Sequence, residues 1–188
     1  MARRVRRFGG SALIAASLAG CAGATVINST EYYNGYWPGE QVYAGNQLHV
    51  QVVGDPFTPP PATFEAAVID AMQHMGGPTE FTTGPGPARS PYFAVMLFNP
   101  GPTMTGERVC AAPDKVTQSP PPGPGARLPL LAVLCRGSQY LSAAAGTLSP
   151  ATGPLDPKFR DDIRQFTLTL FPQFNPDGRN LPDFDLPT

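Results

Sequence analysis

Histidine, tryptophan and charge are scarce in this chain of 188 residues. It holds two histidines and one tryptophan, and charged residues make up 14% of it. His49 and His74 have no second histidine or close carboxylate at the spacing of metal ligands, which argues against a zinc site. Ser138 lacks the Gly-x-Ser-x-Gly pattern of a nucleophile elbow, and no Gly-Lys-Ser/Thr of a phosphate loop follows the Gly-Pro runs. We therefore expect no catalytic residue, no metal ion and no cofactor.

A long hydrophobic run is also missing at the start of the chain. Four arginines lie within the first seven residues, and an apolar stretch follows over Ser11–Gly20. That stretch is far shorter than the roughly 20 residues that a membrane-spanning helix needs. A basic start, a short apolar segment and small residues before a cleavage site are typical of a secretory signal. We predict that residues 1–20 are an export signal.

The four residues Leu18-Ala19-Gly20-Cys21 resemble the lipobox of bacterial lipoproteins. The resemblance implies that Cys21 receives a diacylglycerol and further acyl chains such as palmitate, which would anchor the protein to the membrane. Two acyl chains suffice for stable anchoring. The residue after the cysteine is Ala22 rather than aspartate, which in Gram-negative lipoproteins favours the outer membrane. We expect the protein at the outer membrane, facing the periplasm.

Basic residues are few after the signal, whereas proline is abundant. Four of the 13 basic residues lie in residues 1–20, so nine remain against 14 acidic ones, a net charge of about −5. Such a surface does not favour nucleic acid, whose binding depends on basic residues. All 24 prolines follow the signal, about three times their usual share. Because proline lacks a backbone donor, we expect a modest core surrounded by long Pro/Gly-rich loops.

Hydrophobic periodicity predicts strands over 47–53, 92–98, 130–135 and 139–144, the last two as a hairpin. A helix is predicted over 63–75, and a second begins at Asp156-Pro157 and ends at Pro172. The expected fold is α+β, a small two-layer sandwich of a mostly antiparallel sheet with two helices. The expected segments are the signal, a lipidated tether, one domain and an irregular tail, over 1–20, 21–31, 32–172 and 173–188.

The two remaining cysteines, Cys110 and Cys135, form a pair in a chain predicted to be exported. The periplasm is oxidising, so the simplest interpretation is a disulfide. It would close a loop of about 25 residues, worth roughly 3 kcal/mol in the chain-entropy model. A reactive thiol pair is the alternative, although no Cys-x-x-Cys spacing favours it.

An aromatic stretch near the start of the expected domain is the feature that most suggests binding. Tyr33, Tyr36 and Trp37 lie close together in sequence, and such residues dominate partner interfaces. We consider them possible contacts for an envelope protein or for peptidoglycan. The alternative is that they form a first strand and close one end of the core.

Two functions remain open on the sequence alone. The first is a non-catalytic structural or partner-binding role for a membrane-anchored envelope lipoprotein. The second is a periplasmic hydrolase in which carboxylates such as Glu65, Asp70 or Glu107 converge. Asp161 and Asp162 are adjacent on the second helix, so their side chains point about 100° apart. We expect both to face water rather than to form a catalytic pair.

Overall fold

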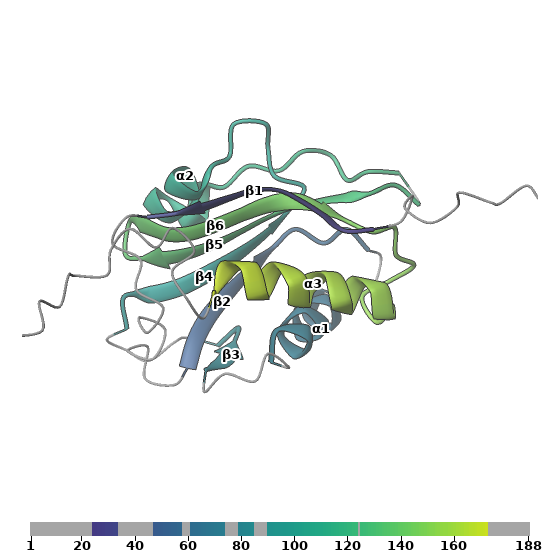
Figure 1. Cartoon of the computed structure of the whole chain (residues 1–188), viewed down its shortest axis with the longest axis horizontal. Helices are drawn as coiled ribbons and strands as arrows, with labels where there is room; N and C mark the ends of the chain where they lie inside the picture. The colour runs from purple at the N-terminus through teal and green to yellow at the C-terminus, as the bar shows by residue number, and fades with distance from the viewer. Residues whose placement is uncertain are drawn as a thin grey trace, which may run out of the picture.

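The structure is a computed structural model that describes residues 24–33, 47–57, 61–73, 79–84, 90–123 and 125–172. These residues form a mixed sheet with the strand order β1-β6-β5-β4-β2-β3 (Figure 1). The strands are β1 (Val26–Tyr32), β2 (Gln47–Val53), β3 (Glu80–Thr82), β4 (Tyr92–Phe98), β5 (Leu128–Arg136) and β6 (Gln139–Leu148).

The middle of the sheet consists of the most apolar strands. β4 and β5 are buried over most of their length on both faces, and they pair antiparallel. β5 and β6 form the predicted antiparallel hairpin, although both strands are longer than expected. β2 pairs parallel with β4 on one side and with β3 on the other. The predicted bounds of the strands at 47–53 and 92–98 are confirmed.

One face of the sheet is covered by α1 (Pro61–Gln73) and α3 (Pro157–Leu170). Their apolar stripes pack on the sheet and form the larger core, which includes Phe64, Val68, Met72, Phe159, Ile163, Phe166 and Leu170. Asp156 caps α3, with proline at its start, as predicted. α1 begins two residues earlier than expected, and the predicted end of that helix at residue 75 lies outside the described residues.

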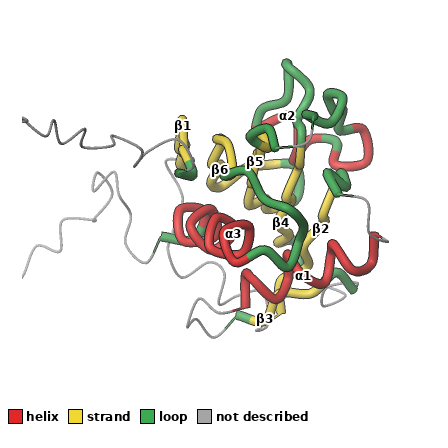
Figure 2. The backbone as a smooth tube through the Cα atoms, turned by 90° about the vertical axis from the view of Figure 1, so that its right-hand side faces the viewer, coloured by secondary structure: helices red, strands yellow, loops and turns green. Residues whose placement is uncertain are grey.

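The opposite face carries a smaller layer that the sequence did not reveal. Figure 2 shows the short helix α2 (Gly106–Ala111) on the other side of the strands from α1 and α3. It is followed by the single turn η2 (Pro113–Lys115). A second core cluster, including Val95, Val109 and Val133, lies beneath α2. The α+β class is therefore confirmed, and the expectation of two helices is corrected to three helices in the described parts of the chain. None of these helices is long and apolar enough to span a membrane.

Strand β1 corrects the expectation of a tether over residues 21–31. Val26–Tyr32 pairs antiparallel with β6 at one edge of the sheet, so the folded unit begins before residue 32. The strand escaped prediction because only Ile27 and Tyr32 are partly buried, while its other residues are exposed. Gly146 of β6 pairs with Ile27, where the register of β1 shifts between Ile27 and Ser29. A Cβ at Gly146 would lie 2.1 Å from the Val26 carbonyl oxygen.

Candidate functional site

A cleft of about 540 Å³ lies at the end of the sheet where β5 begins and β6 ends. We call it the proline cleft. Three connections form it: the residues after β2, the proline-rich segment before β5, and the residues between β6 and α3. Its lining residues are Pro56, Phe57, Pro121, Pro122, Gly123, Gly125, Ala126, Leu128, Ser149, Pro150, Ala151, Thr152 and Phe159.

Aromatic side chains join the cleft to the larger core. Phe57 packs edge-on against Phe159 and Phe64, with ring centroids 5.4 and 5.9 Å apart. Its backbone N–H donates to the Asp55 carboxylate at 3.0 Å, which fixes the turn after β2. Phe159 is fully buried, and Leu128 is nearly so. The cleft therefore has an apolar interior that is continuous with a packed core.

Two carboxylates of the α3 region hold the 149–152 wall of the cleft. The backbone N–H of Ser149 donates to Asp162 at 2.6 Å, and both residues are buried. At the other end of the wall, the N–H and the hydroxyl of Thr152 donate to Asp156 at 3.1 and 3.2 Å. Hydrogen bonds from the backbone of Thr152, and then of Lys158, hold the pKa of the Asp156 carboxyl below its ordinary value of 3.8. The wall is thus a fixed feature of the fold.

None of the described residues that line the cleft carries a charge. Four of the 13 lining residues are prolines, which have no backbone N–H to donate. The N–H groups of Phe57, Ser149 and Thr152 are already donated to carboxylates of the protein, so few donors remain for an occupant. Concave apolar sites of 300–1,000 Å³ with few polar groups are typical of ligand-binding pockets. The cleft is suited to an uncharged, largely apolar occupant.

The start of the described chain lies beside this cleft. The hydroxyls of Thr25 and Ser149 are 3.4 Å apart, and Val26 is opposite Thr147 in the sheet register. In Figure 1 the beginning of β1 and the first turn of α3 lie at the same end of the sheet. The segment that precedes Ala24 therefore joins the domain at the cleft.

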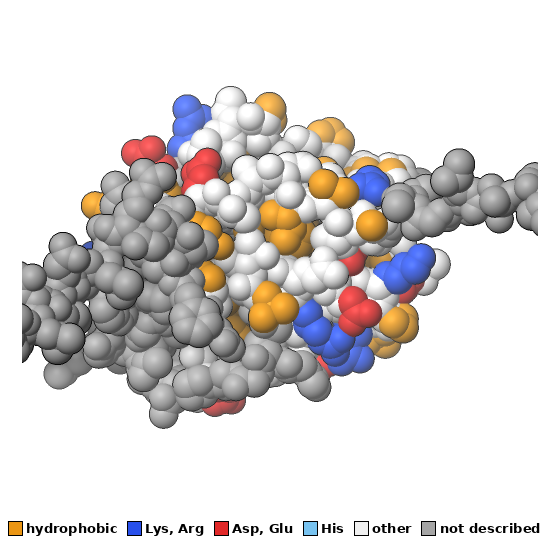
Figure 3. Space-filling model, viewed as in Figure 1, with side chains coloured by type: hydrophobic (Ala, Val, Ile, Leu, Met, Phe, Trp, Pro, Cys, Tyr) orange, Lys and Arg blue, Asp and Glu red, His pale blue; other side chains and the backbone are white. Residues whose placement is uncertain are grey.

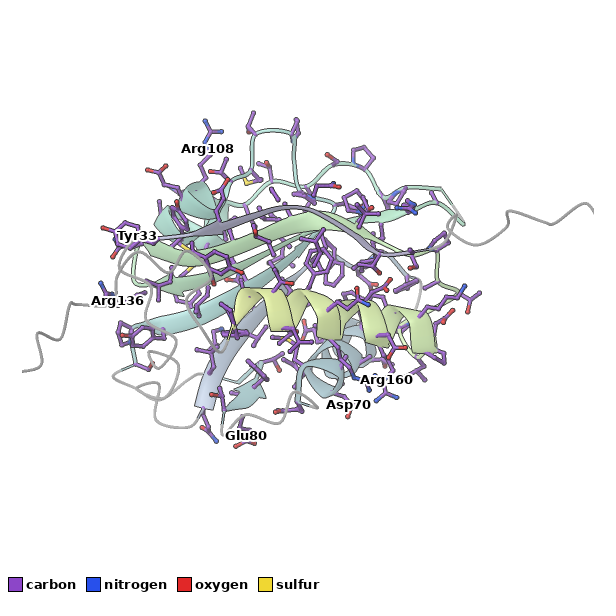
Figure 4. The ribbon with its side chains drawn as sticks, viewed as in Figure 1. Tyr33, Asp70, Glu80, Arg108, Arg136 and Arg160 are labelled. Carbon is purple, nitrogen blue, oxygen red and sulfur yellow. A yellow bond between two sulfur atoms is a disulfide. The ribbon has the colours of Figure 1, made fainter. Side chains whose placement is uncertain are left out.

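Tyr33, the described member of the predicted aromatic contact, lies at the opposite end of the sheet from the cleft. Tyr33 is 40% exposed and packs edge-on against Tyr140, with ring centroids 6.3 Å apart. Figure 4 shows Tyr33 at the same end as Arg136, away from the start of α3. Tyr36 and Trp37 lie outside the described residues, as does Cys21. Tyr33 therefore lies at the opposite end of β1 from the start of the described chain.

Cys110 and Cys135, predicted to pair, are joined by a disulfide with Cα atoms 5.5 Å apart. The bond connects α2 to β5 on the face opposite α1 and α3. His49, considered above only as a metal ligand, is partly buried, and its Nδ1 donates to the Gly84 carbonyl at 2.6 Å. His74 lies outside the described residues, and Ser138 is exposed in the turn between β5 and β6.

The carboxylates considered for a hydrolase do not converge. Glu65 and Asp70 lie on α1, whereas Glu107 lies on α2 across the sheet. Asp70 forms an ion pair with Arg160 of α3, and Figure 4 shows the two side chains together. Charged side chains gather where α1 and α3 lie side by side (Figure 3).

Asp162 is a correction to the expectation that both adjacent aspartates face water. Asp161 is exposed and pairs with Arg164, but Asp162 is only 5% exposed and points toward the end of β6. Successive helix positions are about 100° apart. The angle that argues against a catalytic pair also turns the Asp162 side chain inward while Asp161 faces water. Asp162 was therefore missed as a structural residue.

No sequence motif marked the cleft, because its three walls are far apart in the chain. The proline clusters at 56–61 and 120–124 indicate loops, and nothing in their spacing indicates that Pro56 and Pro121 line the same cleft. Within the described ranges, no group of three or more His, Cys, Asp or Glu residues is arranged to hold a metal ion. In comparisons with known proteins, the chain matches no protein-family model, no curated protein and no solved structure.

Proposed function

We propose that this protein is a lipid-anchored component of the bacterial cell envelope whose domain binds an apolar ligand in the proline cleft without catalysing a reaction. The observation that carries the proposal is the cleft at the end of the sheet where the described chain begins, with an uncharged described lining and one wall held by Asp162 and Asp156. The lipobox-like Leu18-Ala19-Gly20-Cys21 supplies the anchor in this proposal. Residue Ala22 favours the outer membrane, with the domain in the periplasm.

Hydrolysis is the second candidate, and one observation favours it. The Ser149 hydroxyl is 3.4 Å from a carboxylate oxygen of Asp162, and Ser149 lines the cleft. An activated serine needs a general base within hydrogen-bond reach. However, the other oxygen of Asp162 already accepts the Ser149 backbone N–H at 2.6 Å, and the hydroxyl contact is long. This geometry favours a structural role for Asp162, so binding is the stronger proposal.

The anchor is tested by labelling cells with radioactive palmitate. The wild type should incorporate label and sediment with membranes, whereas Cys21→Ser should remain unlabelled and appear in the soluble periplasmic fraction. Label in the Cys21→Ser protein, or a mature N-terminus other than residue 21, would contradict the proposal.

The cleft is tested with a photoreactive amino acid placed in intact cells at Thr152, which lines the cleft, or at Ser138, which is exposed at the far hairpin. Binding in the cleft predicts a discrete adduct from position 152 and none from position 138. Equal adducts from both positions would show non-specific contact. Turnover of ester or amide substrates that Ser149→Ala abolishes would instead favour the hydrolase.

A further inference from the structure

If Cys21 carries lipid as proposed above, the short segment after it holds the proline cleft close to the membrane. Thr25 is the fourth residue after Cys21, and Thr25 contacts Ser149 in the cleft wall. Even a fully extended chain spans at most about 14 Å over four residues. The head-group region of one leaflet is itself on the order of 5–8 Å thick. The cleft therefore stays within a short distance of the membrane surface.

The other end of the sheet is held farther away. β1 contains seven residues, and a strand rises about 3.4 Å per residue, so Val26 and Tyr32 lie about 20 Å apart. Tyr33 is at the distant end (Figure 4). Of the two features considered for binding, only the cleft lies next to the point of attachment.

The cleft also has the chemistry of a site for hydrocarbon. The lining residues that the structure describes carry no charge, and the interior of the cleft is formed by Leu128, Phe57 and Phe159. Proline-rich walls leave few backbone donors for an extended peptide, which needs partners for its own N–H and C=O groups. A hydrocarbon chain has no such need, and the apolar side chains of the cleft would keep its methylenes out of water, as the bilayer does.

We propose that the proline cleft accommodates one acyl chain of a phospholipid from the bilayer to which the protein is anchored. This inference rests on the proposed function, because the anchor places the cleft at the bilayer. Charged residues near the lining carry both signs: Arg127, Lys158 and Asp55 are adjacent in sequence to lining residues, and Asp156 accepts hydrogen bonds from Thr152. The inference therefore concerns the acyl chain and not the head group.

The test uses the full lipidated protein in vesicles of phosphatidylcholine and phosphatidylglycerol. A small fraction of the phosphatidylcholine carries a photoreactive diazirine on one acyl chain. After flotation and irradiation, mass spectrometry locates the labelled residues. Label is expected on the segments 54–57, 120–128 and 149–159, and not on the 136–140 hairpin. Because only bilayer lipid carries the diazirine, acyl chains attached to Cys21 do not contribute to the signal.

Two matched variants separate the cleft from general proximity to the membrane. Ala126→Trp adds bulk at an exposed residue of the lining, and Ala111→Trp adds the same bulk at an exposed position on α2. The first should reduce cleft labelling to background, and the second should leave it unchanged. Both should retain the wild-type melting temperature, and Thr152→Trp serves as a second cleft variant.

The possible failures are distinguishable. If the protein does not float with the vesicles, the anchor and hence both proposals fail. If it floats but the label is absent from the cleft, is equal at the hairpin, or is unaffected by Ala126→Trp and Thr152→Trp, the lipid inference is overturned while the anchor stands.

Discussion

The carboxylate of Asp162 accepts the backbone N–H of Ser149 at 2.6 Å, within the larger core. Ser149 is the first residue after β6, and Asp162 lies in the second turn of α3. Both side chains are buried, at 4% and 5% exposure. This bond fixes how the chain leaves the sheet and enters the helix, and it thereby sets one wall of the proline cleft.

Removing this carboxylate should destabilise the domain. We expect Asp162→Ala to reduce the free energy of unfolding by about 1–3 kcal/mol, because it leaves the buried Ser149 N–H without an acceptor. Asp161→Ala is the matched control, because the Asp161 carboxylate is exposed and pairs with Arg164. This variant should change the free energy of unfolding by no more than about 0.5 kcal/mol. Urea unfolding measures both. Equal effects from the two variants would contradict the structural role of Asp162.

Gly146 should tolerate no side chain. A Cβ there would meet the Val26 carbonyl oxygen at 2.1 Å and the Ile27 Cα at 2.8 Å. We expect Gly146→Ala to displace β1 and to cost about 1–3 kcal/mol, as overpacking does. Gly153→Ala is the control, because nothing lies within 4 Å of its Cβ position. Hydrogen exchange should show faster exchange of the β1 amides in Gly146→Ala alone; unchanged β1 protection would refute the close approach.

The disulfide should contribute measurably to stability. Unreduced protein should yield linked peptides containing Cys110 and Cys135 by mass spectrometry. Replacing both cysteines with serine should reduce the free energy of unfolding by roughly 3 kcal/mol in the chain-entropy model. Rapid alkylation of both thiols in the folded, unreduced protein would show that the bond is absent.

Asp156 should make stability depend on pH in the acid range. Its pKa is lowered in the folded protein by the Thr152 and Lys158 backbone hydrogen bonds, so the carboxylate stabilises the fold at pH values above its unfolded value of 3.8. That contribution is lost as the pH falls through the lowered folded pKa. Asp156→Ala should therefore lower the melting temperature at neutral pH, and the difference from wild type should shrink well below pH 3.8. A constant difference across this range would exclude the carboxylate as its source.

Truncating the aromatic stretch distinguishes a core role from a contact surface. Tyr33 is exposed, so Tyr33→Ala should have little effect on the melting temperature. If Trp37 is part of the core, Trp37→Ala should cost about 3–5 kcal/mol. If the stretch contacts an envelope protein or peptidoglycan, both variants should instead keep their stability and lose crosslinks to that partner in cells.

The sequence was most informative where burial is strong and periodic. The strand over Tyr92–Phe98 is apolar throughout and buried at the centre of the sheet, and the Asp156-Pro157 pair marks the start of α3. β1 gave no such signal because an edge strand buries few side chains. β3 has three residues and α2 has six, too few for hydrophobic periodicity to be detected.

The candidate site was less predictable than the fold. Proline clusters indicate loops, but no local pattern indicates which loops lie next to each other. The proximity of Phe57 to Phe159 depends on the pairing of strands far apart in the chain. The burial of Asp162 depends likewise on where β6 ends relative to α3.

The position of β1 has a mechanical consequence for an anchored protein. Tension on a lipidated Cys21 would reach the domain at Val26 and act along the axis of β1. Backbone hydrogen bonds between antiparallel strands run perpendicular to that axis, so the bonds from β1 to β6 would bear the load together in shear rather than open one after another. An edge strand that contributes little to the hydrophobic core would then be the element that resists extraction of the domain from its anchor.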